Sequence, residues 1–307
     1  MSKLDENEPY WCEQAPTVPR VWSSSSLKTI AECPRRFQLS YVDGWTGGDR
    51  NIDLEFGTAW HGLLESYWLL RTTGKPHDKI LRELVVTALS TDLPPPTKPS
   101  NKGKTPLGLA RSLVWYFEQY KQDEINDLVT VGGDPAIELH FSVALPLTNP
   151  DGEPYYLQGY VDQLRSFAGN HAVWDYKTTS GDVGDYYADR FLIDIQNQIY
   201  LLAAQALTDE KYTIFIADAI GLGVTYTSFL RIAIQITPNL LDEALLDINS
   251  WIRLAETCAE TNYYPKNTSA CTFCQFKGIC DKDPVSREAF LTTTFTKKRR
   301  EFVGRNK

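Results

Sequence analysis

The sequence has no long run of apolar residues. Its most apolar stretch, residues 199–207, is too short to cross a bilayer and contains Gln205. The first eleven residues, MSKLDENEPYW, also lack the basic-then-apolar pattern of a secretory signal. We therefore expect an ordinary globular protein of the cytoplasm, with no membrane partner.

Positive charge is in deficit. The chain has 31 Lys and Arg against 39 Asp and Glu, which gives a formal net charge of −8 at pH 7. This balance argues against a protein that coats nucleic acid by its bulk charge. It leaves open an enzyme whose acidic residues hold a cation between themselves and a phosphodiester.

The hydrophobic pattern changes from helical to strand-like and back along the chain. Residues 22–41, 55–72 and 107–124 have helical spacing, and residues 137–145, 155–167 and 171–179 alternate as strands. A helix at 189–207, strands at 212–220 and 224–236, and a helix at 238–260 follow. The pattern predicts a mixed α/β (α+β) fold in which the first three strands form an antiparallel meander flanked by helices.

The same pattern predicts five segments. They are a flexible arm at 1–21, a helical region at 22–135 with an exposed Pro- and Lys-rich loop at 90–106, a strand core at 136–237, a helix and cysteine cluster at 238–285, and a basic tail at 286–307.

Two carboxylates and a lysine are expected to meet on the strands. Asp175 and Lys177 are two residues apart on one strand and therefore share a face, and a short turn brings Asp162 alongside. Two converging carboxylates are costly unless a metal neutralises them. Carboxylate oxygens of this kind suit Mg²⁺ or Mn²⁺. The alternative is a pair of strand-end acids beside an ordinary surface lysine.

Residues of other segments can complete such a site. His61 lies on a predicted helix and can supply a nitrogen ligand, although a lone helical histidine is more often structural. Gln196 and Tyr200 share one helical face, from which they can contact a phosphate or Lys177. Glu138 lies opposite the apolar stripe of its strand and can support the site, although a solvated strand face explains it equally well.

Three cysteines are closely spaced as Cys271-x₂-Cys274-x₅-Cys280. In a reducing compartment such a cluster points to a metal rather than to disulfides. Three thiolates need a fourth ligand, and the nearest in sequence is Cys258 on the preceding helix. A structural zinc ion and unligated thiols both remain as alternatives.

The order of four short motifs carries a family resemblance. The motifs are Gly57-x₃-His61, Gly159-x₂-Asp162, Asp175-x-Lys177 and Gln196-x₃-Tyr200, preceded by Ser23–Leu27 and by Cys33-Pro34-Arg35-Arg36-Phe37. With these motifs the chain resembles the PD-(D/E)XK nucleases, and more closely the RecB and AddB nuclease domains and the CRISPR-associated exonucleases related to them. Each motif is weak alone, but their order and spacing over residues 22–281 are specific.

The resemblance implies a restriction-endonuclease-like mixed sheet and a set of site residues. It implies that His61, Asp162, Asp175 and the backbone carbonyl of Tyr176 bind the metal. It implies that Lys177 is the catalytic base or an electrostatic stabiliser, and that Gln196 and Tyr200 contact the substrate or the site. Asp175 stands where many relatives have Glu, and the family allows either carboxylate.

The resemblance also supplies the fourth cysteine, Cys33. It implies that Cys33, Cys271, Cys274 and Cys280 hold a [4Fe–4S] cluster that joins the N- and C-terminal helical parts. Cys12 and Cys258 are then free thiols. Arg35, Arg36 and Lys277 lie beside these cysteines in sequence and are expected to contact DNA.

The resemblance implies a metal-dependent DNA exonuclease that hydrolyses phosphodiester bonds at single-stranded or frayed ends during recombination or repair. Its expected location is the cytoplasm of a bacterium or of a phage-infected host cell. A helicase, an annealing protein or a spacer-integration complex is the expected partner besides DNA. Two alternatives remain open, a non-catalytic DNA-binding or scaffolding subunit of a helicase–nuclease complex, and a zinc-bound interaction module.

Overall fold

The computed structural model describes residues 4–48, 50–124 and 127–303, which group into two compact units. Unit 1 comprises residues 1–49, 141–159 and 239–307, and unit 2 comprises residues 50–140 and 160–238. Each unit is therefore assembled from segments that are far apart in the sequence. No helix within the described ranges is both long enough and apolar enough to cross a membrane.

Unit 2 is built on a mixed sheet. Strand β6 (Pro154–Phe167) ends in this unit and pairs antiparallel with β7 (Asn170–Ser180). Strand β8 (Ile214–Leu222) runs parallel to β7, and β9 (Thr227–Gln235) runs antiparallel to β8. A parallel pair needs a crossover, which contains α7 (Ile195–Thr208). The mixed sheet flanked by helices confirms the predicted fold class.

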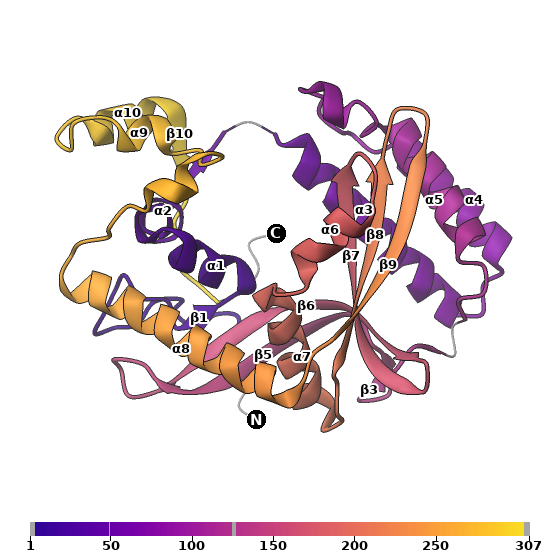
Figure 1. Cartoon of the computed structure of the whole chain (residues 1–307), viewed down its shortest axis with the longest axis horizontal. Helices are drawn as coiled ribbons and strands as arrows, with labels where there is room; N and C mark the ends of the chain where they lie inside the picture. The colour runs from indigo at the N-terminus through magenta and orange to yellow at the C-terminus, as the bar shows by residue number, and fades with distance from the viewer. Residues whose placement is uncertain (1–3, 49, 125–126, 304–307) are drawn as a thin grey trace. The chain divides into compact units, whose positions relative to one another are not determined.

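Helices cover the two faces of this sheet differently (Figure 1). Helices α3 (Ile52–Thr72), α4 (His77–Leu89) and α5 (Pro106–Gln119) share a hydrophobic core with Ala172, Trp174 and Tyr176 of β7. Side chains alternate along a strand, so Asp175 and Lys177 point to the other face, toward α7. Unit 2 also contains β3 (Thr130–Val131), β4 (Asp134–Pro135), η2 (Pro99–Asn101), α6 (Asp185–Ala188) and η4 (Asp189–Phe191).

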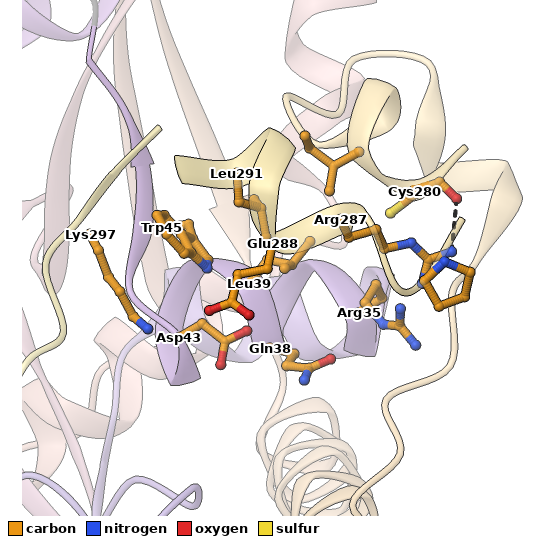
Figure 2. Close-up of a pocket in the computed structure, with 12 residues that line it drawn as sticks. Arg35, Gln38, Leu39, Asp43, Trp45, Cys280, Arg287, Glu288, Leu291 and Lys297 are labelled. Carbon is orange, nitrogen blue, oxygen red and sulfur yellow. Dashed lines mark hydrogen bonds between the residues drawn. The ribbon is translucent and has the colours of Figure 1, made fainter. Parts of the chain in front are cut away.

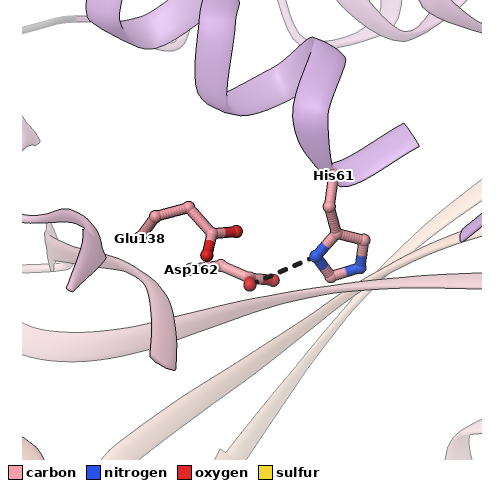
Figure 3. Close-up of side chains that lie close together, drawn as sticks. All are labelled: His61, Glu138 and Asp162. Carbon is pink, nitrogen blue, oxygen red and sulfur yellow. Dashed lines mark hydrogen bonds and ion pairs between the residues drawn. The ribbon is translucent and has the colours of Figure 1, made fainter. Parts of the chain in front are cut away.

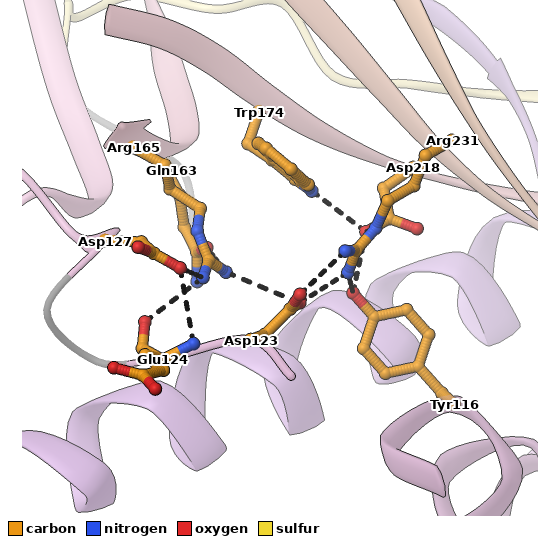
Figure 4. A network of polar contacts seen from close by, with 9 residues as sticks. All are labelled: Tyr116, Asp123, Glu124, Asp127, Gln163, Arg165, Trp174, Asp218 and Arg231. Carbon is orange, nitrogen blue, oxygen red and sulfur yellow. Dashed lines mark hydrogen bonds and ion pairs between the residues drawn. The ribbon is translucent and has the colours of Figure 1, made fainter. Parts of the chain in front are cut away.

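A buried polar network ties the helical face to the sheet (Figure 4). Asp218 on β8 is fully buried and accepts hydrogen bonds from Trp174 Nε1 at 2.9 Å and from the Tyr116 hydroxyl at 2.7 Å. Arg231 on β9 donates to the same carboxylate oxygen at 2.9 Å and forms an ion pair with Asp123. Removing one partner of a buried pair costs about 3–5 kcal/mol, so the network holds α5, β7, β8 and β9 in register.

A hairpin links β5 (Ile137–Thr148) to β6. Its turn is stabilised by Asn149, whose Oδ1 accepts from the backbone N–H groups of Asp151 at 2.9 Å and Glu153 at 3.0 Å. The turn lies between the two strands predicted at 137–145 and 155–167. Strands β5, β6 and β7 follow one another in the sheet, as expected for the predicted meander.

Unit 1 gathers the helices that precede and follow this hairpin. Strand β1 (Val21–Trp22) runs parallel to the start of β6, and α1 (Ser24–Glu32) begins at Ser23, which forms a capping box with Ser26. The remaining elements are α2 (Pro34–Phe37), η1 (Gln38–Val42), β2 (Trp45–Gly47), α8 (Pro238–Glu260), η5 (Thr268–Cys271), α9 (Lys277–Cys280), α10 (Arg287–Thr294) and β10 (Phe295–Lys297).

The two ends of the chain depart from the expected flexible arm and solvated basic tail. Tyr10, Cys12 and Val18 are buried, and the Tyr10 N–H donates to the Glu301 carbonyl at 2.8 Å. Strand β10 pairs antiparallel with β2. The ends are thus ordered by pairing with each other and with β2, a contact between distant segments that local composition does not reveal. Residues 1–3 and 304–307 lie outside the described ranges.

The Pro- and Lys-rich loop at 90–106 is irregular but only partly exposed. Asn101 and Lys104 are buried. The Lys104 ammonium pairs with Asp53 of α3 at 2.7 Å. A buried lysine is tolerated here because its charge has a carboxylate partner.

Candidate functional site

Three residues of unit 2 form a group with metal-ligand geometry (Figure 3). His61 comes from α3, Glu138 from β5 and Asp162 from β6, and one ligand atom of each lies within 4.8 Å of the others. His61 Nδ1 lies 3.2 Å from Asp162 Oδ1. Across the described ranges no other set of three or more His, Cys, Asp or Glu ligand atoms is as compact.

Glu138 has an unusual backbone. Its φ of 47° lies in the left-handed region, which non-glycine residues seldom adopt. Such strain persists only where the surroundings enforce it, and it is common at functional sites. In Figure 3 the Glu138 carboxylate lies beside that of Asp162. The sequence suggested Glu138 only as a supporting residue, whereas the structure brings it into the compact group itself.

Asp162 is fixed by the strand beside it. It is 7% exposed, and its Oδ2 accepts the backbone N–H of Tyr176 at 2.6 Å. The pairing of β6 with β7 runs from Phe167 opposite Asn170 to Gln163 opposite Trp174. Asp162 directly precedes Gln163, the last residue of β6 in this pairing. Its side chain bonds to β7 through Oδ2, and its Oδ1 faces His61.

Asp175 and Lys177 form an ion pair on β7, on the face that their spacing predicted. Asp175 is 2% exposed, and burial raises the pKa of its carboxyl although the Lys177 charge opposes this. Burial alone would lower the pKa of Lys177, but the charges of Asp175 and then Asp162 outweigh it and raise the pKa. Lys177 is therefore an ammonium ion at neutral pH.

The carboxylates create a strong negative potential at His61. Burial alone would lower the pKa of its imidazole, but the charge and hydrogen bond of Asp162, with Asp175 behind it, raise the pKa to about 9. Without a metal the carboxylates thus hold a proton on His61 at neutral pH. Metal ligation requires a neutral imidazole, so a divalent ion would replace this proton.

Helix α7 provides a polar wall opposite Asp175. Gln196 Nε2 lies 3.4 Å from Asp175 Oδ1, and Asp194 caps the helix by accepting the Gln196 N–H at 2.9 Å. Tyr200 lies one turn further on, and burial, followed by the charges of Asp175 and Asp162, raises its pKa, so that its hydroxyl stays protonated.

Two residues near the lysine were not singled out from the sequence. Asp194 raises the pKa of Lys177. The pKa of Tyr187 is raised by burial, which outweighs the opposing charges of Arg190 and Lys177. Asp194 lay inside the helix predicted at 189–207, whereas in the structure it is the N-cap of α7. Tyr187 lies in α6, which was not predicted, and had no signal.

The four predicted cluster cysteines lie in one neighbourhood of unit 1. The Asn267 N–H donates to Cys33 Sγ at 3.4 Å, and the Asn267 carbonyl accepts from Cys271 Sγ at 3.7 Å. The pKa of Cys280 is raised by burial and by the neighbouring Cys274 and Cys33, with Arg35 and Arg287 opposing. All six cysteines of the chain are free thiols, including the buried Cys12 and Cys258.

The sulfur atoms of the four cysteines are near one another but are not spaced as around a single metal ion. A tetrahedral zinc site with bonds near 2.3 Å places its sulfur atoms about 3.8 Å apart. Within the described ranges, no three thiols lie within 4.8 Å of one another. The structure therefore assembles the four cysteines but does not show a metal cluster.

The predicted DNA-contacting cations have different surroundings. Arg35 donates from Nε to the Tyr264 carbonyl at 2.9 Å, and Arg36 pairs with Glu32 at 2.8 Å. Lys277 is exposed at the start of α9. Figure 2 shows a pocket of about 350 Å³ beside Cys280, into which Arg35, Arg287 and Lys297 bring positive charge, and Asp43 and Glu288 negative charge. Such mixed charge gives no clear preference for an anion.

Comparison with known proteins identifies a family. Residues 21–281 match the family model of the PD-(D/E)XK nuclease superfamily. A solved structure named "Putative exonuclease", from Eubacterium rectale, is 15% identical, with a TM-score of 0.48 and coverage of 94% of this chain and 98% of the other. The solved structure of SSO0001 is 16% identical, with a TM-score of 0.34 and coverage of 85% and 86%. No curated protein matches the chain.

Proposed function

The chain belongs to the PD-(D/E)XK nuclease superfamily, and from this premise we propose that it is a metal-dependent DNA exonuclease of the RecB-like type. The observation that carries the proposal is the convergence of His61, Glu138 and Asp162 beside the Asp175–Lys177 pair. A nuclease domain that no longer catalyses cleavage would be expected to lose one of these groups. Their presence counts against a non-catalytic scaffolding subunit.

The donor set fits a hard divalent cation. Carboxylate oxygens and one imidazole nitrogen are ligands that Mg²⁺ and Mn²⁺ accept. The raised pKa of His61 indicates that the site attracts positive charge. We propose that His61, Asp162, Asp175 and the Tyr176 carbonyl hold the ion, with Glu138 as a further ligand. When bound, the metal would acidify a water molecule and polarise the phosphoryl oxygen.

Lys177 is proposed to stabilise negative charge that develops on the phosphate. The alternative role of catalytic base requires loss of the ammonium proton, which a bound metal would favour by neutralising the carboxylates that raise the pKa of Lys177. Asp175 holds the ammonium on the face that carries the metal ligands. Gln196 fixes Asp175 by a hydrogen bond, and the protonated hydroxyl of Tyr200 can donate to a phosphate oxygen.

The four cysteines are proposed to hold a [4Fe–4S] cluster that joins α1 and α2 to α9 within unit 1. Four thiols from two distant segments match the ligand number of such a cluster. The alternative is a structural zinc ion held by the same four thiols, because four cysteines also satisfy tetrahedral zinc.

DNA ends are the proposed substrate, in recombination or repair, with a helicase, an annealing protein or a spacer-integration complex as partner. The test is digestion of single-stranded and duplex DNA labelled at either end, with Mg²⁺, Mn²⁺ or EDTA. We expect metal-dependent release of short products from single-stranded or frayed ends. Internal cutting of a circular single strand at a similar rate would contradict an exonuclease, and absence of cleavage with either metal would contradict the enzyme.

A further inference from the structure

Unit 1 contains a second pocket, separate from the one beside Cys280. Its volume is about 360 Å³, which lies within the range of small-ligand sites. Every described lining residue carries a hydroxyl group or a positive charge, and none is a carboxylate. The lining residues are Tyr10, Ser23, Ser40, Tyr41, Lys298 and Arg300.

The positive side of the pocket is well anchored. The Arg300 guanidinium lies over the Tyr10 ring, 5.0 Å from its centroid, and the Arg300 carbonyl accepts the indole N–H of Trp11 at 2.5 Å. The Lys298 N–H donates to the Gly44 carbonyl at 2.7 Å. Both cations therefore extend from backbone that is hydrogen-bonded to other segments of unit 1, rather than from the solvated tail expected from the sequence.

The hydroxyl side consists of donors that stay protonated. Tyr10 is 2% exposed, and burial raises its pKa to about 12 despite the nearby Arg300. The pKa of Tyr41 is also raised, again mainly by burial. Ser23 is the N-cap of α1, a helix of nine residues with no acidic side chain in its first turn. The positive end of the helix dipole thus adds to the two cations.

This combination recognises a phosphate group. Lysine, arginine and hydroxyl donors with a helix N-terminus are the groups that bind phosphate oxygens of nucleic acids. The chain has a net charge of −8, so a lining with two cations and no carboxylate stands out against the whole.

We propose that this pocket binds a backbone phosphate of the DNA strand that the enzyme degrades. The proposal rests on the proposed nuclease function, since it identifies a further contact for the same substrate. A phosphodiester within a strand and the phosphate of a free nucleotide present the same chemistry. The test therefore includes both.

The experiment measures binding of a fluorescently labelled 20-nucleotide oligo(dT) by anisotropy, in EDTA so that no cleavage occurs, over a series of salt concentrations. Lys298→Gln with Arg300→Gln is expected to weaken binding by at least about 10-fold and to lower the slope of log K against log[salt] by about 0.7, because one phosphate contact on a single strand is lost. The neighbouring Lys297→Gln removes one positive charge outside this pocket. Its effect should be much smaller than that of Lys298→Gln alone.

Equal affinities and slopes for wild type and the double variant would overturn the proposal. Micromolar binding of thymidine monophosphate that is lost in the double variant and leaves the oligonucleotide affinity unchanged would also overturn it. If Arg300→Gln fails to fold, Lys298→Gln alone is decisive, because Lys298 is exposed. Metal-dependent cleavage by the wild type, measured in parallel, shows whether the nuclease function itself or only the pocket assignment has failed. If cleavage is present and the pocket variants bind normally, only the pocket assignment fails.

Discussion

Replacing Lys177 with alanine is expected to lower the rate of DNA cleavage by about 10³-fold, the loss found when a donor to a charged transition state is removed. The reason is that Lys177 supplies an ammonium ion beside the metal ligands, held there by Asp175. The fold should survive, because Asp175 can take up a proton; burial already raises its pKa. Single-turnover cleavage of end-labelled single-stranded DNA, with circular dichroism as a check of folding, measures the effect.

A matched control is Lys75→Ala. Lys75 also pairs with a carboxylate, that of Glu83, but at the surface and outside the group around His61. Its replacement should leave the cleavage rate within about two-fold, since surface ion pairs contribute little. Full activity of the Lys177 variant in a preparation free of host nucleases would refute the assignment of this site.

Replacing Cys271 with serine is expected to remove the visible absorbance of the purified protein and to destabilise unit 1. A ligand present at about 1,000 times its Kd stabilises a fold by about 4 kcal/mol. For a unit of between about 100 and 150 residues this corresponds to about 16 °C in the unfolding temperature. Iron and sulfide analysis, the absorption spectrum and a thermal melt test these three effects together.

Cys258→Ala serves as the control for Cys271. Cys258 is buried on α8 and is not among the proposed ligands, so its replacement should leave iron content and colour unchanged. A colourless wild-type protein with one zinc ion per chain would replace the iron–sulfur assignment with zinc. An equally coloured and equally stable Cys271 variant would contradict the proposed joining role of the cluster.

The residues whose placement follows from local periodicity could be predicted from the sequence. Asp175 and Lys177 share a face because they lie two apart on one strand, and Gln196 and Tyr200 lie on one helix, where Gln196 reaches Asp175. The helical position of His61 also follows from local pattern. Its approach to Asp162 depends on how α3 packs against β7, and only the order of the motifs suggested it.

Features that depend on distant contacts or on backbone strain could not be predicted. Glu138 belongs to the ligand group and has a left-handed φ. Glutamate is not a residue type that signals such a backbone conformation. The Asp218–Arg231 pair joins two strands whose pairing the sequence does not specify. The order at the ends of the chain could not be predicted either. Their composition suggested a flexible arm and a basic tail, but β10 pairs with β2, which lies far away in the sequence.

The central claim is that side chains from α3, β5, β6 and β7 bind one divalent cation. The most direct measurement is an anomalous-difference map from crystals grown with Mn²⁺, collected at the manganese edge. We expect a peak within bonding distance of His61 and Asp162, with Asp175 or Glu138 as a further ligand, and its loss in an Asp162→Asn variant. A well-ordered map with no peak there, or with manganese bound only elsewhere, would contradict it.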